Sequence, residues 1–238
     1  MEFLASPLMW AALGNIILVN IVLSGDNAVV IAMAARGLPP AQQRKAIVFG
    51  SAAAILLRVV LTIFALQLLA LPYLKIAGAI LLFWIGAQLL AEEENEEQGI
   101  AVHASLAAAI RTILIADLIM SLDNVLGVAA ASKNNIALLT AGLAISIPLI
   151  VFGSTLVLKL LERVPFLIVL GAALLGYLAG EMLFSDPAIA PWVAVNMPRH
   201  DIALAVSGSF LSGPGLVGAI AVVLVGHWMS RRDARRNY

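Results

Sequence analysis

The sequence predicts an all-α protein, a polytopic membrane helix bundle of about seven transmembrane helices, built as two inverted three-helix repeats plus a C-terminal helix. Three observations lead to this fold class: the apolar content, the length of the apolar runs and a polar motif that occurs twice. Of the 238 residues, 62% are apolar and 12% are charged, and the mean hydropathy is +1.03. Soluble domains average about 45–50% apolar and about 25% charged residues. The composition therefore indicates an integral membrane protein.

The apolar runs have the length of membrane spans. A helix needs roughly 20 apolar residues to cross the hydrocarbon core of a bilayer, and polar or proline-marked breaks such as Arg36–Lys45 and Glu92–Gly99 separate runs of that size. The predicted spans lie at about 9–35, 46–70, 73–91, 105–131, 136–161, 166–184 and 210–229.

A repeated motif divides these spans into two sets. Asn20-x-x-x-Ser24-Gly25-Asp26-Asn27 in the first run recurs as Asp117-x-x-x-Ser121-Leu122-Asp123-Asn124 in the fourth, and Leu71-Pro72-Tyr73 recurs as Val164-Pro165-Phe166. Each copy contains three spans, and an odd number of spans gives the two copies opposite orientations. A single membrane domain then comprises repeat one (about 9–91), an acidic linker (about 92–104), repeat two (about 105–184), an extracytoplasmic loop (about 185–209), the last helix (about 210–229) and a basic tail (230–238).

The basic residues predict the orientation in the membrane. Cytoplasmic segments carry an excess of Lys and Arg, and an N-terminus outside with a C-terminus inside leaves only Lys75, Lys133 and Arg199 on the external side. We expect a multi-pass protein of the cytoplasmic (inner) membrane of a bacterium. The cytoplasmic residues would be Arg36, Arg44, Lys45, Arg111, Lys159, Arg163, Arg231, Arg232, Arg235 and Arg236.

Three acids inside the spans predict an ion site. Asp26, Asp117 and Asp123 lie in apolar runs, where a charged side chain costs roughly 2.5–3.5 kcal/mol, or about 8–10 kcal/mol for all three. Protons, a counter-ion or a bound cation must offset that cost. Asn27 and Asn124 add amide oxygens, and oxygen ligands suit Mg²⁺, Ca²⁺ and Mn²⁺. The five residues are the predicted metal ligands, although the Asn and Ser residues of the motifs could also serve only in hydrogen bonds between helices.

Three further polar residues are candidates for gating or proton coupling. Asn20 occupies the position in repeat one that Asp117 occupies in repeat two. Arg58 lies at the centre of the second predicted span, where it could be the counter-ion of one Asp or a gate. Glu181 lies near the end of the sixth predicted span, where it could be an interfacial acid or part of a proton relay.

Several functional classes are excluded or disfavoured. The chain has no cysteine, which excludes disulfides, thiolate metal sites, iron–sulfur clusters and cysteine catalysis. Its net charge is zero, so we expect no nucleic-acid partner. Neither a phosphate-binding Gly-x-x-x-x-Gly-Lys-Ser/Thr loop nor a His-Glu-x-x-His run occurs. We therefore expect no enzyme and no permanent cofactor.

The two motifs resemble the signature of a known family. Ser-Gly-Asp-Asn-Ala-Val-Val at 24–30 and Ser-Leu-Asp-Asn-Val-Leu-Gly at 121–127, at the same depth in two three-helix units, look like the TerC family of integral membrane proteins, in particular its compact bacterial branch associated with metal transport. The resemblance covers nearly the whole chain. It implies Mn²⁺ export for some members and, through the family name, an association with tellurite resistance. It assigns importance to Asp26, Asn27, Asp123 and Asn124, with Asp117 as the intramembrane acid before the second motif.

These observations predict a secondary transporter that exports divalent metal cations, with Mn²⁺ as the preferred ion, through alternating access coupled to protons. The alternative is a non-transporting membrane scaffold or accessory protein in metal or tellurite stress or in metalloenzyme maturation. The expected partners are the transported cation and the lipid bilayer. The sequence predicts neither protein partners nor the oligomeric state.

Overall fold

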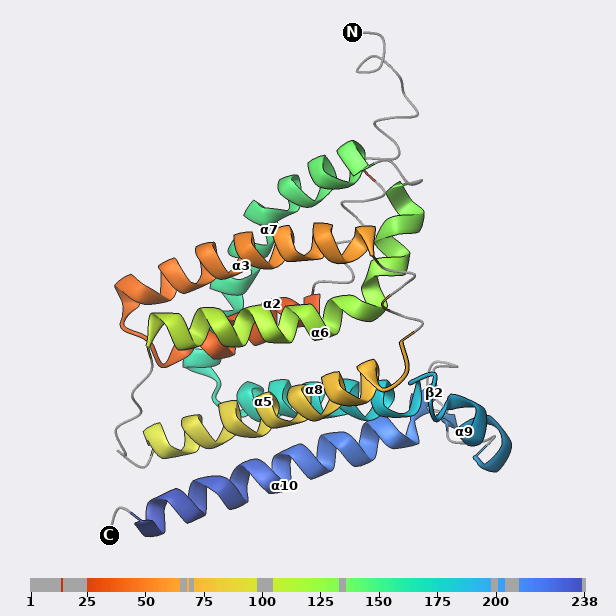
Figure 1. The fold of residues 1–238 in the computed structure, drawn as a ribbon. Helices are drawn as coiled ribbons and strands as arrows, with labels where there is room; N and C mark the ends of the chain where they lie inside the picture. Colours follow the sequence, from red (N-terminus) through yellow and green to blue (C-terminus); the bar gives the residue numbers. More distant parts are fainter. Residues whose placement is uncertain are drawn as a thin grey trace, which may run out of the picture. The chain divides into compact units, whose positions relative to one another are not determined.

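The computed structural model describes residues 14, 25–64, 68, 71–97, 105–132, 136–197, 201–203 and 210–236. Within these ranges it leaves out the side chains at 96–97, 123–132, 136–139, 201–203, 210–211 and 233–236. Eight helices and two short strands lie in the described part (Figure 1). They are α2 (Gly25–Arg36), α3 (Pro40–Ile63), α5 (Leu74–Glu97), α6 (Leu106–Ser132), α7 (Ile136–Arg163), α8 (Phe166–Phe184), α9 (Ala190–Asn196), β1 (Asp201–Ala203), β2 (Phe210–Ser212) and α10 (Gly213–Arg236).

The helices have the character of membrane spans. Among the described residues, five helices are long and apolar enough to cross a bilayer, in α3, α5, α7, α8 and α10. The α8 helix has the predicted range, whereas α3 begins earlier than predicted because Pro40 occupies its first turn, where proline is well tolerated. The last helix begins at Gly213 instead of near residue 210, since Phe210–Ser212 pairs with Asp201–Ala203 as an antiparallel strand. The chain is a helical membrane protein.

The chain folds into two compact units. Unit 1 comprises Met1–Leu69 and Ser105–Leu160, and unit 2 comprises Ala70–Ala104 and Leu161–Tyr238. Unit 1 therefore holds α2, α3, α6 and most of α7, and unit 2 holds α5, α8, α9, α10 and the two strands. Each unit draws helices from both halves of the sequence.

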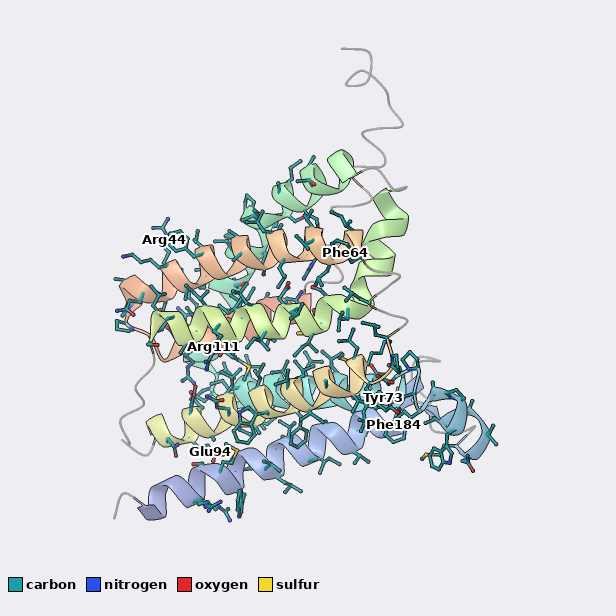
Figure 2. The ribbon with its side chains drawn as sticks, viewed as in Figure 1. Arg44, Phe64, Tyr73, Glu94, Arg111 and Phe184 are labelled. Carbon is teal, nitrogen blue, oxygen red and sulfur yellow. The ribbon has the colours of Figure 1, made fainter. Side chains whose placement is uncertain are left out.

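In unit 1, the helices α2, α3 and α6 pack against one another. A Cβ atom added to Gly50 of α3 would lie 2.8 Å from Cδ1 of Ile113 on α6, so the two helices approach closely there. Farther along both helices, Arg58 bonds to Ser121. Because both contacts advance in the same direction along the chain, α3 and α6 run parallel. Figure 2 agrees, with Arg44 and Arg111 toward one end of these helices and Phe64 at the other end of α3.

In unit 2, the helices α5, α8 and α10 pack against one another. A Cβ atom on Gly176 of α8 would collide with the carbonyl oxygen of Gly218 on α10, and one on Gly180 would collide with the carbonyl oxygen of Pro214. Small residues permit this close approach of backbones in membrane helices. At the other end of the unit, Glu94 of α5 pairs with His227 of α10, and Ser230 donates a hydrogen bond of 3.1 Å to Asn95. The helices α8 and α10 thus pack through their backbones at these glycines, and two polar side-chain contacts join α5 to α10 at the other end.

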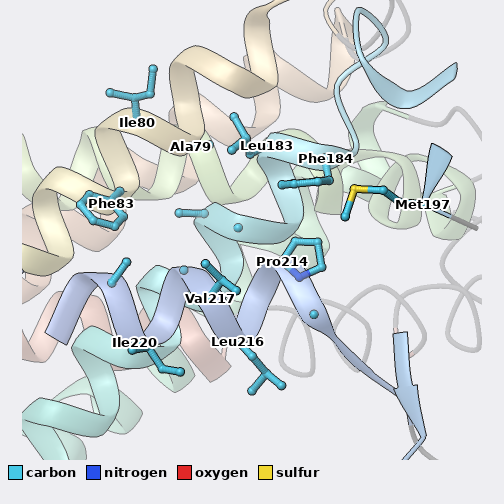
Figure 3. A pocket seen from close by; sticks show the side chains of 15 residues that line it. Ala79, Ile80, Phe83, Leu183, Phe184, Met197, Pro214, Leu216, Val217 and Ile220 are labelled. Carbon is cyan, nitrogen blue, oxygen red and sulfur yellow. The ribbon is translucent and has the colours of Figure 1, made fainter. Parts of the chain in front are cut away.

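An apolar cavity of about 690 Å³ lies among α5, α8 and α10 (Figure 3). Its walls include Phe83, Leu183, Met197, Pro214 and Val217. None of the lining side chains is charged or carries an oxygen ligand, which a hard cation requires. The cavity therefore does not qualify as a site for a divalent cation.

A buried carboxylate joins the ends of α5 and α8. Asp186, which follows α8, is fully buried and accepts hydrogen bonds of 2.8–3.2 Å from the backbone N–H groups of Tyr73, Lys75, Ile76 and Ala188. Burial acts to raise the pKa of the Asp186 carboxyl, but the four N–H donors together hold that pKa below its usual value. Tyr73 has a positive φ of 67°, so the chain turns sharply as it enters α5. The ionised Asp186 stabilises this turn.

Candidate functional site

A buried ion pair connects α3 and α6 in unit 1. Arg58 is 1% exposed, and its Nη2 lies 2.5 Å from Oδ1 of Asp117. Its Nε donates a hydrogen bond of 3.0 Å to Oγ of Ser121, and that hydroxyl donates one of 3.2 Å to Oδ2 of Asp117. The three side chains form a closed ring in which both carboxylate oxygens have partners. Arg58 is paired with Asp117, as the counter-ion role requires, and its predicted role as a gate stays a prediction.

The packing of α3 on α6 explains why these groups meet. Asp117 and Ser121 are one turn apart on α6, so they share a face of that helix. The contact of Gly50 with Ile113 fixes the register of the two parallel helices. Arg58 follows Gly50 by the same number of residues as Ser121 follows Ile113, which places the arginine opposite the polar face of α6.

Asp26 of α2 belongs to the same polar cluster. Its carboxylate interacts electrostatically with the guanidinium of Arg58 and with the carboxylate of Asp117. Its Oδ1 accepts a hydrogen bond of 2.8 Å from the backbone N–H of Asn27. The first motif and the second repeat thus contribute one acid each around a single arginine. When both acids are ionised, Arg58 compensates only one of the two negative charges.

Two buried polar side chains, one on α2 and one on α3, lack hydrogen-bond partners among the described residues. Asn27 is 3% exposed, and both its Oδ1 and its Nδ2 are without such a partner. Oγ of Ser51, which is 1% exposed, is in the same situation. A buried amide without a partner costs about 1–3 kcal/mol. An unused amide oxygen next to Asp26 is also a ligand that a hard cation prefers.

The sequence did not single out Ser51. It lies seven residues before Arg58, which puts it on the same face of α3, and this spacing is the signal that could have identified it. Serine is common in membrane helices as a hydrogen-bonding residue, so the spacing has value only once the orientation of Arg58 is known.

Of the other predicted site residues, Glu181 is described in full, whereas Asn20, Asp123 and Asn124 are described only in part or not at all. The backbone of α6 is helical through Asp123 and Asn124, but their side chains lie outside the described part, as does Asn20 altogether. Glu181 is exposed in the last turn of α8 and belongs to unit 2, and its role in gating or proton coupling stays a prediction. Among the side chains that the structure describes, no three acids or histidines come together in a metal-binding group. The predicted set of five ligands therefore stays a prediction.

Chemically, the cluster is suited to binding a cation. It offers carboxylate oxygens from Asp26 and Asp117 and an amide oxygen from Asn27, all of which are hard ligands, and it holds one fixed positive charge in Arg58. These groups lie in or beside long apolar helices, where a charge is expensive unless it is compensated.

A family model and several known proteins match most of this chain. The model of the family described as Integral membrane protein TerC family matches residues 5–234. The Uncharacterized membrane protein YjbE of Bacillus subtilis (strain 168) is 46% identical over 176 residues, which cover 74% of this chain and 80% of that protein. The UPF0053 inner membrane protein YgdQ of Escherichia coli (strain K12) is 28% identical over 218 residues, which cover 77% of this chain and 92% of that protein. No solved structure gives a significant match.

Proposed function

Because the chain belongs to the TerC family of integral membrane proteins, we propose that it is a secondary transporter that exports a divalent cation, with Mn²⁺ as the preferred ion. The observation that carries this proposal is the cluster in unit 1, where Asp26 and Asp117 both interact with the buried Arg58. One acid comes from each repeat, as expected if the cation site lies between two related halves. The charge left uncompensated by Arg58 favours a cation over an anion or a neutral substrate.

The ligands that we propose are Asp26, Asn27, Asp117, Asp123 and Asn124. The buried amide of Asn27, without a hydrogen-bond partner among the described residues, supports its part in this set. Carboxylate and amide oxygens suit Mn²⁺ and Mg²⁺ better than they suit Cu⁺ or Zn²⁺. Met33 and Met120 are buried helical residues that could add a softer sulfur ligand, which would favour Mn²⁺ over Mg²⁺.

The proposed architecture has seven spans in two inverted repeats, with the N-terminus outside and the C-terminus inside. The parallel course of α3 and α6 supports it, because the second span of repeat one and the first span of repeat two would both start at the cytoplasmic face. The composition of the two units also supports it, since each contains helices from both repeats.

Proton coupling completes the proposal. Protonation of Asp26 or Asp117 would remove a negative charge that the cation needs, so a pH gradient could drive its release. Alternating access of the two repeats would expose the site first to one side of the membrane and then to the other.

The test is Mn²⁺ flux in proteoliposomes with an imposed pH gradient. We expect flux with the wild-type protein and its loss in Asp26→Asn, Asp117→Asn and Asp123→Asn. Glu162→Gln is the matched control, because it neutralises an exposed carboxylate at the end of α7, and it should retain wild-type flux. If the wild-type protein moves no divalent cation, the transporter proposal is wrong and the membrane scaffold becomes the better interpretation.

A further inference from the structure

Resting on the proposed function, we infer that Arg58 is a built-in competitor of the transported cation. Its guanidinium holds Asp117 when no divalent cation is bound, and it must withdraw from Asp117 before the cation can bind there. The competition would set both the affinity of the site and the rate at which the empty transporter returns.

The contacts of Asp117 carry the first step of this inference. Oδ1 is 2.5 Å from Nη2 of Arg58, and Oδ2 accepts the hydroxyl of Ser121. A divalent cation needs a carboxylate oxygen at roughly 2.0–2.6 Å. A guanidinium in contact with the same oxygen would place two positive groups side by side, which the apolar surroundings make especially unfavourable. Arginine and cation are therefore alternatives at Asp117.

The chemistry of arginine carries the second step. A guanidinium stays protonated at any physiological pH, so Arg58 cannot vacate Asp117 by losing its proton. It has to move, and the bond of Nε to Ser121 provides a pivot that can persist while Nη2 leaves Asp117. Ser121 thus becomes a positioning residue for the exchange.

The charge of the cluster carries the third step. Without Arg58, the empty site would hold the buried carboxylate of Asp117 and the partly buried carboxylate of Asp26 without the guanidinium that interacts with both. Such a site is costly inside a membrane protein, and its conformational return without cargo would be slow. With Arg58 in place, one of the two negative charges is compensated. The arginine would weaken binding and speed turnover at the same time.

The experiment measures Mn²⁺ binding to the purified full-length protein and, in parallel, Mn²⁺ flux in proteoliposomes. For Arg58→Gln we expect a Kd at least tenfold lower than that of the wild type, together with a maximal flux reduced at least tenfold and a lower KM. Arg58→Lys retains the positive charge and should restore part of the flux. Arg111→Gln, which removes an exposed arginine of α6, is the matched control and should leave both quantities unchanged.

A second variant keeps the test decisive if Arg58→Gln does not fold. Ser121→Ala retains both charges but removes the Nε acceptor and the donor to Oδ2 of Asp117. We expect a Kd severalfold below that of the wild type, because the loosened arginine competes less well. If Arg58→Gln folds and binds Mn²⁺ no more tightly than the wild type, the inference about Arg58 is wrong. If Arg58→Gln does not fold, the same result in Ser121→Ala overturns that inference. Either result leaves the proposed function standing. Absence of Mn²⁺ binding by the wild type would instead overturn the proposed function.

Discussion

The two units differ in the groups that lie between their packed helices: charged side chains in unit 1, and glycine backbone with apolar side chains in unit 2. Unit 1 buries a ring of Arg58, Asp117 and Ser121, and the carboxylate of Asp26 interacts electrostatically with Arg58 and Asp117. Unit 2 brings the backbones of α8 and α10 together at glycines and encloses an apolar cavity beside them. Buried charges are weak evidence for stability because their desolvation offsets their attraction. Close apolar packing, in contrast, stabilises membrane helices directly.

This difference distinguishes a unit with buried charge between its helices from one with close backbone packing. A chain that needed only a stable bundle could pack unit 1 in the manner of unit 2. The arginine and two acids among α2, α3 and α6 are costly in apolar surroundings, and this cost is why we expect unit 1 to serve a purpose besides stability. We therefore expect substitutions in unit 1 to affect cation binding and those in unit 2 to affect stability alone.

The largest effect is expected from Asp117→Asn. It leaves the guanidinium of Arg58 buried without its anionic partner at Oδ1, and breaking a buried ion pair costs about 3–5 kcal/mol. We expect the free energy of unfolding in detergent micelles to fall by that amount and Mn²⁺ flux to vanish.

The double substitution Arg58→Met with Asp117→Leu separates the two consequences. It removes both charges together, so the free energy of unfolding should return to within about 1 kcal/mol of the wild-type value. Flux should stay absent, because the proposed site has lost a ligand. A double variant that transports Mn²⁺ would show that the ion pair is only structural.

A smaller effect is expected in unit 2 from Gly180→Val. Its Cβ would collide with the carbonyl oxygen of Pro214, a backbone atom that cannot turn aside, so α8 and α10 must separate. Overpacking of this kind costs about 2–3 kcal/mol. The loss should appear in the free energy of unfolding, whereas the Kd for Mn²⁺ should stay at the wild-type value.

Gly153→Ala on α7 is the matched control for that substitution. A Cβ atom at Gly153 has no neighbour within 4 Å among the described residues, so alanine should be neutral or stabilise the helix by up to about 1 kcal/mol. If Gly180→Val also weakened Mn²⁺ binding, unit 2 would contribute to the site and the division between the units would fail.

Much of the fold could be predicted from the sequence, because apolar length determines the spans. The range of α8 was predicted correctly, and those of α6 and α7 closely. The ends of α3 and α5 were missed because hydropathy does not detect their polar turns: α3 begins at Pro40, and α5 continues through the acidic run to Glu97. The two short strands depend on pairing between distant residues, which no local pattern indicates.

The candidate site could be predicted only in part. The cost of buried charge identified Asp26, Asp117 and Arg58 directly from the sequence. Which acid Arg58 would hold depends on the register of α3 against α6, and that register depends on how Gly50 packs on Ile113. Asp186 was passed over because it lies in a predicted loop, although its four N–H partners make it a structural anchor.

Asp186 gives unit 2 a pH dependence that can be measured. Its pKa is lowered in the folded protein, so its ionised form contributes stability above the unfolded-state value of about 3.8. That contribution is lost as the pH falls through the lower, folded-state pKa. Asp186→Asn should reduce the free energy of unfolding by about 2 kcal/mol at neutral pH, because N–H groups lose a charged acceptor.

The difference between the wild type and Asp186→Asn should be constant above about pH 5 and should shrink below about pH 4. Unfolding measured at several pH values provides the comparison. A difference that persists unchanged at pH 3 would mean that hydrogen-bond geometry, and not the charge of Asp186, stabilises the turn at Tyr73.

A small stability effect, opposite in sign to the effect on cation binding, is expected from Asn27→Leu in unit 1. Leucine has the same branched shape, and it removes a buried amide that lacks a partner among the described residues. The free energy of unfolding should therefore rise by about 1 kcal/mol, while Mn²⁺ binding should weaken at least tenfold because an oxygen ligand is lost. A substitution that stabilises the protein and weakens cation binding together would place Asn27 at the site. Destabilisation would instead mean that its amide bonds to a residue outside the described part, and the polar cluster of unit 1 would then serve the packing of its own helices.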